Sequence, residues 1–425
     1  MEKSNNIVYR TVIALFLKIT GAAIGLFLSI YLSRHLGASE LGKYYLALSL
    51  LTVPLTVCIF GLNTSTMKVL STFNLNNENK EINTYFFVSL VLVLFASILM
   101  VFTIFHFNEY FFTKVYGNQT IKDIFIYLSL SLLPLALFNL FGHALLSIKS
   151  TFFGMIVLGI LHNILILLIS LFFPLEQAQD IVGYYVFSAY VTLFVAAVIW
   201  IFKIRTFCCY KFNKKHFSNV FEGSTSNFLA QSLGQLYTQV PILIIGHYYL
   251  SNDVAHYGVS LKLAMLISFI LMAVNRVVAP DFSFLYSQGE MESLKMLVRK
   301  STRLMIAVSL PVLVFVLFFG EQVLSFYGDD FIIASKCLTI LAFSQFIYVF
   351  SGNVNVLLQM SNNENVVRDS SLVSAISIAL LSTWLVPLWG IEGAAVSTLI
   401  SMSLANALSA IRAKNILGIN TFRFW

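Results

Sequence analysis

Charged residues are scarce in this chain. Only 11% of its 425 residues are Asp, Glu, Lys or Arg, whereas 58% are hydrophobic and the mean hydropathy is +0.85. A soluble domain carries roughly 25% charged residues, so the composition excludes an ordinary soluble protein and favours a polytopic membrane protein. The net charge of +7 would suggest a nucleic-acid ligand in a soluble protein. Here we assign it to basic cytoplasmic loops and expect no nucleic-acid partner.

Cysteine is also rare, and its positions give neither a disulfide framework nor metal-ligand spacing. The sequence contains no Walker-type GxxxxGK[ST] motif and no polar segment long enough for a cytosolic nucleotide-binding domain. We therefore expect no cofactor and no metal site. No cleavage site follows MEKSNNIVYR, which predicts an uncleaved first helix.

Long apolar runs make up most of the chain. A helix that crosses a bilayer needs ~20 apolar residues, and the runs of this length predict an all-α polytopic membrane protein with about 12 transmembrane helices. The runs lie near 11–33, 43–63, 84–106, 122–147, 152–173, 181–202, 223–247, 256–280, 303–320, 332–357, 370–388 and 391–411.

The distribution of Lys and Arg predicts the orientation of these helices. Of the 26 Lys and Arg residues, 18 fall on the side of the N-terminus and five on the opposite side, which predicts that both termini are cytoplasmic. The remaining three, Lys18, Lys262 and Arg276, lie inside spans. All Asp and Glu residues fall outside the span interiors, so any fixed charge there is predicted to be positive.

The stretch 254–282 carries two of the intramembrane cations. Lys262 and Arg276 are 14 positions apart, so on a helix they lie about 40° apart around the axis and ~21 Å apart along it. A charge in hydrocarbon costs at least ~2.5–3.5 kcal/mol, and such residues usually face a wet cavity or a ligand. The pattern predicts a helix that lines a water-filled path and meets an anion. The alternative is that both side chains snorkel to the interface.

The first span places Lys18 on a face with the small residues Ala22, Gly25, Ser29 and Ser33. This stripe is typical either of a cavity wall or of close helix packing. Arg34, at the far end of the span, either receives an anion there or marks the membrane interface.

The seventh span has a polar stripe of Asn227, Gln231 and Gln235, flanked by Ser224 and Thr238. Amides are costly in hydrocarbon unless they are paired. They would either line a wet cavity or form hydrogen bonds between helices.

An offset of 213 positions aligns the two halves of the chain, matching Tyr44 with Tyr257 and Pro174 with Pro387. The match favours a duplicated six-plus-six transporter with parallel repeats around a central cavity. We expect an N-terminal six-helix lobe at 1–205, a basic cytoplasmic linker at 206–222 and a C-terminal six-helix lobe at 223–425.

Three motifs resemble those of the polysaccharide-biosynthesis oligosaccharide flippases, which belong to the multidrug/oligosaccharidyl-lipid/polysaccharide exporter superfamily. They are YLSRHLGASELGKYYLALSLL at 31–51, AHYGVSLKL with APDFSFLYSQGE in the second half, and PLWGIEGAAVSTLIS at 387–401. The second-half turn LSNDVAHY departs from the pattern because it lacks the glycines of the first. The Wzx-type O-antigen flippases are the most similar subgroup.

This resemblance implies two six-helix lobes and alternating access in the bacterial inner membrane. It implies a cargo of undecaprenyl-diphosphate-linked oligosaccharide, with membrane lipids, a polysaccharide polymerase and a chain-length regulator as partners. The cations Lys18, Arg34, Lys262 and Arg276 would then meet the diphosphate, and Asn227, Gln231 and Gln235 the sugars.

Three other functions remain open. A multidrug or cation antiporter of the same superfamily would be expected to carry an intramembrane Asp or Glu. A lipid II flippase would tend to be longer. A membrane enzyme such as a polymerase would need paired carboxylates near the membrane surface; Asp329 and Asp330 are the nearest pair, and we interpret them as part of a loop turn.

Overall fold

The computed structural model describes residues 2–75, 79–115, 119–204, 214–419 and 421, and every regular element within them is a helix. The elements are α1 (Glu2–Ile59), α2 (Leu62–Leu75), α3 (Asn79–Val115), α4 (Gln119–Ser129), α5 (Leu132–Ser147), α6 (Thr151–Gly159), α7 (Leu161–Phe172), α8 (Ala178–Ile204), α9 (Lys214–Tyr248), α10 (Ser251–Ser287), α11 (Met291–Ser325), the 3-10 helix η1 (Asp329–Ala334), α12 (Ser335–Phe350), α13 (Val354–Met360) and α14 (Glu364–Leu417).

Eight helices of the described chain are long and apolar enough to cross a membrane, or up to ten if each of two bent pairs forms one span. The pairs Thr120–Ser129 with Leu132–Ser147 and Thr151–Gly159 with Leu161–Phe172 bend by 43° and 47°. The predicted helix at 122–147 is therefore broken after Ser129, and the predicted helix at 152–173 is broken after Gly159. These spans confirm an all-α polytopic membrane protein, while the count of about 12 stays a prediction.

Two of the long helices are interrupted by a glycine with a positive φ. Gly37 in α1 has φ 69° and ψ 175°, and Gly390 in α14 has φ 59° and ψ −135°. Only glycine adopts such backbone angles without a steric penalty. Both glycines lie between two predicted spans, so α1 and α14 each consist of two helical arms that meet at a kink.

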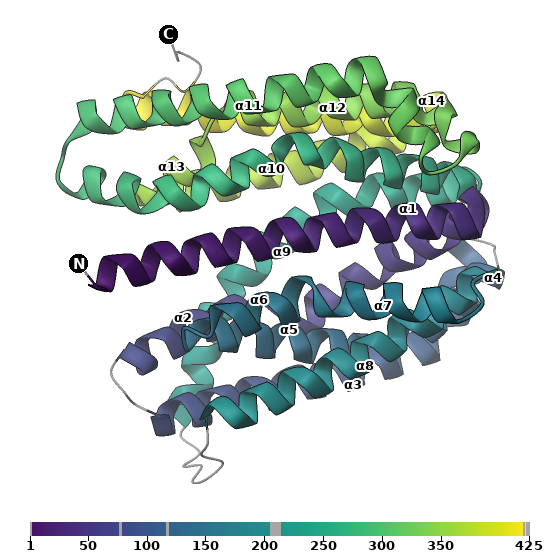
Figure 1. The fold of residues 1–425 in the computed structure, drawn as a ribbon, viewed down its shortest axis with the longest axis horizontal. Coiled ribbons are helices and arrows are strands. Elements are labelled where there is room, and N and C mark those ends of the chain that lie inside the picture. The colour runs from purple at the N-terminus through teal and green to yellow at the C-terminus, as the bar shows by residue number, and fades with distance from the viewer. Residues whose placement is uncertain (1, 76–78, 116–118, 205–213, 420, 422–425) are drawn as a thin grey trace. The chain divides into compact units, whose positions relative to one another are not determined.

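The chain forms two compact units, Met1–Leu36 with Lys43–Gln235 and Gly37–Gly42 with Leu236–Trp425. In the first unit α5 packs against α2, α3, α6 and α8, and its sequence is apolar all round, as expected of a buried helix. In the second unit α10, α11, α12 and α14 run side by side (Figure 1). The predicted lobe boundaries stay a proposal, and the first part of the expected linker, 206–213, lies outside the described residues.

The offset of 213 positions also relates contacts inside the two units. The ring of buried Tyr44 lies 6.2 Å from that of Tyr185, and Tyr257 hydrogen-bonds Thr398 at 2.9 Å, which are the positions 213 further along. Lys149 and Asn362, again 213 apart, have the similar φ values of 63° and 60°. Equivalent positions therefore carry equivalent local structure in both units.

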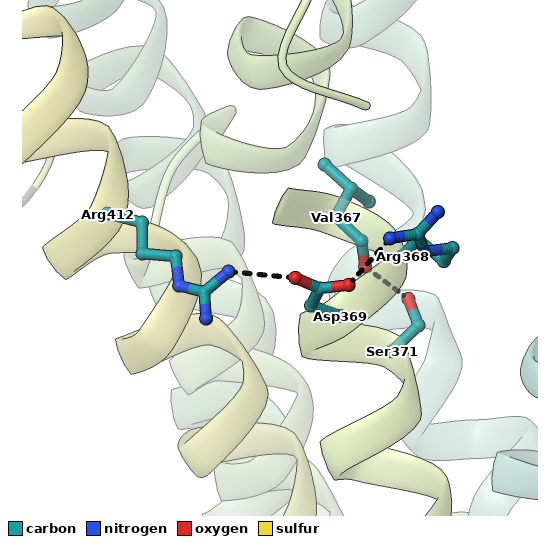
Figure 2. Close-up of polar contacts among 5 residues, drawn as sticks. All are labelled: Val367, Arg368, Asp369, Ser371 and Arg412. Atoms are coloured by element: carbon teal, nitrogen blue, oxygen red, sulfur yellow. Dashed lines mark hydrogen bonds and ion pairs between the residues drawn. The ribbon is translucent and has the colours of Figure 1, made fainter. Parts of the chain in front are cut away.

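An ion-pair cluster joins the two arms of α14 at the ends far from Gly390. Asp369 lies between Arg368 and Arg412, with oxygen–nitrogen distances of 3.1 Å and 3.0 Å (Figure 2). All three side chains are substantially exposed, so the cluster is screened by solvent. It aligns the first arm with the second without requiring buried charge.

Candidate functional site

Lys262 and Arg276 lie on the exposed face of α10. The residues before Lys262, from Val254 to Leu261, are all buried in the second unit, whereas Lys262 itself is exposed. Met265, Met272 and Arg276 follow on the same side of the helix and are exposed as well. The second unit thus leaves uncovered the one stripe of α10 that carries both cations.

Lys18 and Arg34 belong to the first arm of α1. Lys18 is half-buried and Arg34 is exposed, three residues before the kink at Gly37. The small residues near Lys18 pack on neighbouring helices, because a Cβ on Gly21 would lie 3.0 Å from the carbonyl oxygen of Gly159. Ser29 and Ser33 are each only 2% exposed, so this part of the small-residue stripe serves helix packing.

Gln231 of α9 bonds to the start of α2 in the first unit. Its Nε2 donates hydrogen bonds of 3.0 Å to Oδ1 of Asn63 and of 3.0 Å to Oγ1 of Thr64. Nδ2 of Asn63 in turn donates to Oδ1 of Asn139 on α5 at 3.2 Å. Both amide hydrogens of Gln231 therefore have protein acceptors, and interhelical bonding accounts for this member of the polar stripe.

The backbone of α9 also approaches the bend between α1 and α2 very closely. A Cβ on Gly61, which has φ 69°, would lie 2.5 Å from the carbonyl oxygen of Ser224 and 2.6 Å from the nitrogen of Phe228. The ring of Phe60 stacks on that of Phe228, with centroids 4.6 Å apart. Asn227, half-buried, lies against the same glycine, and Gln235 follows two turns further on and is half-buried too.

The second unit contains a comparable amide pair. Nδ2 of Asn353, in the turn before α13, donates to Oδ1 of Asn275 on α10 at 2.6 Å. Oγ of Ser301 on α11 lies 3.4 Å from Oδ1 of Asn353. Asn275 is the neighbour of Arg276, so this network borders the exposed cationic stripe of α10.

Sequence reasoning missed Asn63, Asn139, Asn275 and Asn353. The repeat offset carried a signal for them, because Asn63 and Asn275 are 212 apart and Asn139 and Asn353 are 214 apart, each within one residue of the offset of 213. Each unit thus has an amide pair at nearly equivalent positions of the repeat, which links α2 to α5 in the first unit and α10 to the turn before α13 in the second.

The described part of the chain contains no group of three or more His, Cys, Asp or Glu side chains that could hold a metal ion. Cys58 and Cys337 are buried free thiols, and Cys208 and Cys209 lie outside the described residues. What the site offers chemically is hydrogen bonding by neutral amides and positive charge on exposed faces of α1 and α10.

The family model described as "Polysaccharide biosynthesis protein" matches residues 31–336. The chain belongs to this family. Among curated proteins, the "Probable low-salt glycan biosynthesis flippase Agl15" of Haloferax volcanii is 24% identical over 416 residues, which cover 94% of this chain and 82% of that protein. The family expected from the three motifs is thereby confirmed.

Two solved transporters have a similar fold. A multidrug resistance MATE family transporter of the MOP superfamily, in an inward-facing conformation, matches with a TM-score of 0.78 and 14% identity, covering 96% of this chain and 98% of that one. The lipid II flippase MurJ, in an inward closed conformation, matches with a TM-score of 0.78 and 16% identity, covering 95% and 87%. At these identities the likeness establishes only the fold of this polysaccharide biosynthesis protein.

Proposed function

We propose that this family member is a flippase that moves undecaprenyl-diphosphate-linked oligosaccharide repeat units, of an O-antigen or similar surface polysaccharide, from the cytoplasmic to the periplasmic leaflet by alternating access. The observation that carries the proposal is the family match over 31–336. An alignment with a relative named as a glycan biosynthesis flippase over 94% of the chain supports it. Both termini would be cytoplasmic, and the protein would lie in the bacterial inner membrane.

The charges suit a diphosphate cargo. Lys262 and Arg276 lie on the exposed stripe of α10, and Arg34 is exposed near the kink of α1. Guanidinium and ammonium groups form strong, charge-assisted hydrogen bonds with phosphate oxygens. Together with Lys18 they would receive the diphosphate.

The neutral amides suit the sugar part of the cargo. Asn227 and Gln235 lie on the same stripe of α9 as Gln231, whose two amide hydrogens are engaged by Asn63 and Thr64. Gln231 would hold this stripe in place and offer its carbonyl oxygen, while Asn227 and Gln235 would contact sugar hydroxyls. A polymerase and a chain-length regulator would act on the exported units.

A multidrug antiporter is the second candidate because a MATE transporter shares the fold. The sequence argues against a cationic cargo, since the predicted span interiors carry Lys and Arg and no Asp or Glu. A polymerase is disfavoured because the aligned curated relative is named a flippase, and transport rather than catalysis is the activity we assign.

The test uses purified full-length protein in proteoliposomes with a fluorescent undecaprenyl-diphosphate-linked oligosaccharide. A membrane-impermeant quencher reports which leaflet holds the label. We expect the protein to move the probe between leaflets, and a fluorescent cationic drug to show no protein-dependent movement. A chain that moves the drug and leaves the lipid-linked probe in place would overturn the proposal.

A further inference from the structure

An exposed histidine stands near the end of the first arm of α1, in the first unit. His35 lies two residues before the kink at Gly37, and its side chain is exposed. Its ring stacks on that of Tyr31, one turn earlier, with centroids 4.1 Å apart and 30° between the ring planes. Its Nδ1 lies 2.9 Å from the backbone carbonyl oxygen of Tyr31. The imidazole is therefore held by one face and by one edge.

Tyr31 is itself fixed by a neighbouring helix. Its hydroxyl donates a hydrogen bond of 2.9 Å to the backbone carbonyl of Ser170 on α7, and Ser170 is only 2% exposed. Holding an exposed side chain in one orientation costs conformational entropy, and the stack and the two hydrogen bonds offset that cost. His35 is thus preorganised, which lowers the entropic cost of binding a ligand.

The bond to Tyr31 also decides which ring nitrogen of His35 can receive a ligand. A carbonyl oxygen only accepts, so Nδ1 carries the hydrogen, and in the neutral ring Nε2 keeps its lone pair and is an acceptor. Because Nδ1 turns back toward the helix, Nε2 points away from it. Within the described ranges of the chain no protein group bonds to this Nε2.

The neighbouring Arg34 has the opposite hydrogen-bonding role. Its side chain is exposed, and a guanidinium group only donates. A sugar hydroxyl both donates and accepts, so it can bond to an arginine and to a neutral imidazole. An ionised diphosphate only accepts, so it suits Arg34 and not the lone pair of His35. The two residues together therefore suit a ligand that joins a diphosphate to a sugar.

We propose that His35 is a sugar-specificity residue, whose Nε2 accepts a hydrogen bond from a hydroxyl of the sugar attached to the diphosphate, and that Tyr31 positions it. This inference rests on the proposed function, in which Arg34 meets the diphosphate. By the orientation predicted from Lys and Arg, this end of α1 lies on the periplasmic side. The contact would form when the cargo reaches that side.

The first experiment compares two probes for binding to the full-length protein in detergent micelles. One is the fluorescent undecaprenyl-diphosphate-linked oligosaccharide, the other is fluorescent undecaprenyl diphosphate without sugar, and fluorescence anisotropy gives each Kd. His35→Asn puts an amide nitrogen in the place of Nδ1, so it keeps the bond to Tyr31 and removes Nε2. We expect its Kd for the sugar-bearing probe to rise about two- to tenfold, the value of one neutral hydrogen bond. Its Kd for the sugar-free probe should stay at the wild-type value.

His106→Asn is the matched control. His106 on α3 is an exposed histidine of the same unit, and its ring stacks on that of Phe102, also four residues earlier, with centroids 6.3 Å apart. This variant should bind both probes like wild type, whereas Arg34→Gln should weaken both. Equal losses for the two probes in His35→Asn, or no loss for either, would overturn the proposal.

A second measurement tests the geometry without any cargo. Full-length protein with isotope-labelled histidine is studied by NMR at about pH 9, where an imidazole is ordinarily neutral, and the His35 signal is the one lost in His35→Asn. We expect the hydrogen on Nδ1. Tyr31→Leu removes the stack and should give a mixture of the two tautomers, which shows that Tyr31 positions the ring. A wild-type ring with its hydrogen on Nε2 would contradict the acceptor role.

The proteoliposome assay separates the inference from the function it rests on. If the wild-type protein moves the sugar-bearing probe and His35→Asn binds and moves it equally well, the role of His35 is wrong and the flippase function stands. If the wild-type protein neither binds nor moves this probe, the proposed function fails, and the NMR measurement still decides whether Nε2 of His35 is an open acceptor.

Discussion

At the scale of single residues, the main chemical problem is to keep amides inside an apolar protein. Both units solve it with paired asparagines, Asn63 with Asn139 and Asn353 with Asn275. The type and spacing of polar residues along α9 were visible in the sequence. Their partners were not, because Gln231 and Asn63 are 168 positions apart and only the folded chain brings them together.

Gln231→Leu should destabilise the first unit. The substitution removes two hydrogen bonds and leaves Oδ1 of Asn63 with fewer donors. Hydrogen bonds between membrane helices are worth about 0.6 kcal/mol on average and up to about 1.7 kcal/mol, so we expect a loss of about 1 kcal/mol. Thermal unfolding in detergent measures it. Gln239→Leu is the control, because its Nε2 donates to the adjacent Thr238 on the same helix; an equal fall in Tm for both would contradict the interhelical role.

The cations of α10 should matter for their charge. If the cargo is the proposed diphosphate lipid, Lys262→Gln and Arg276→Gln would each remove a charge-assisted hydrogen bond to it, worth about 1.5–3 kcal/mol, so the flipping rate should fall at least about tenfold. Lys262→Arg and Arg276→Lys should retain more activity. Lys295→Gln, at a residue paired with Glu292 at 2.8 Å, is the control and should transport normally. Equal losses in the charge-keeping and charge-removing variants would indicate packing instead.

At the scale of elements, the glycine kinks in α1 and α14 were easier to predict than the breaks between α4 and α5 and between α6 and α7. Gly37 and Gly390 fall where short polar turns separate two apolar runs, so the sequence places those kinks. The breaks after Ser129 and Gly159 fall inside continuous apolar runs. Hydropathy does not mark these breaks, although Pro134 lies just after the first and Gly159 stands at the second, and both residue types disfavour a helix interior.

Gly61→Ala should test the docking of α9 on the bend between α1 and α2. An alanine at φ 69° costs about 1–2 kcal/mol, and its Cβ would also lie 2.5 Å from the backbone of Ser224, where nothing flexible yields. Gly289→Ala is a matched control, since Gly289 has φ 73° and no atom within 4 Å of an added Cβ. We expect Gly61→Ala to lower Tm by clearly more than Gly289→Ala. Equal shifts would show that α9 yields at this contact.

At the scale of the whole molecule, composition and motifs were sufficient for the class and the family. Scarce charge and long apolar runs require a membrane protein, and the motif at 31–51 and both parts of the second-half motif fall inside the matched region 31–336. The number of spans was less accessible, because hydropathy does not distinguish one kinked helix such as α14 from two. The contacts of the candidate substrate-binding residues also depend on long-range packing. The sequence therefore predicted which residues would take part, and it could not predict what each side chain contacts.

The alternating-access proposal requires that water reach the polar stripe of α9 in at least one state. Single cysteines at Asn227 and Gln235, in a background with the four native cysteines replaced by serine, should react with a membrane-impermeant maleimide, because amides that bind sugars must be hydrated when the cargo is absent. Ser188→Cys and Ser401→Cys are controls for the unit interiors, where both serines are 0% exposed, and should stay unreactive. Phe194→Cys, at an exposed apolar residue of α8, controls for lipid-facing positions. Protection of 227 and 235 equal to that of the interior controls, with and without the lipid-linked probe, would mean that the stripe only packs helices together and that the sugar path runs elsewhere.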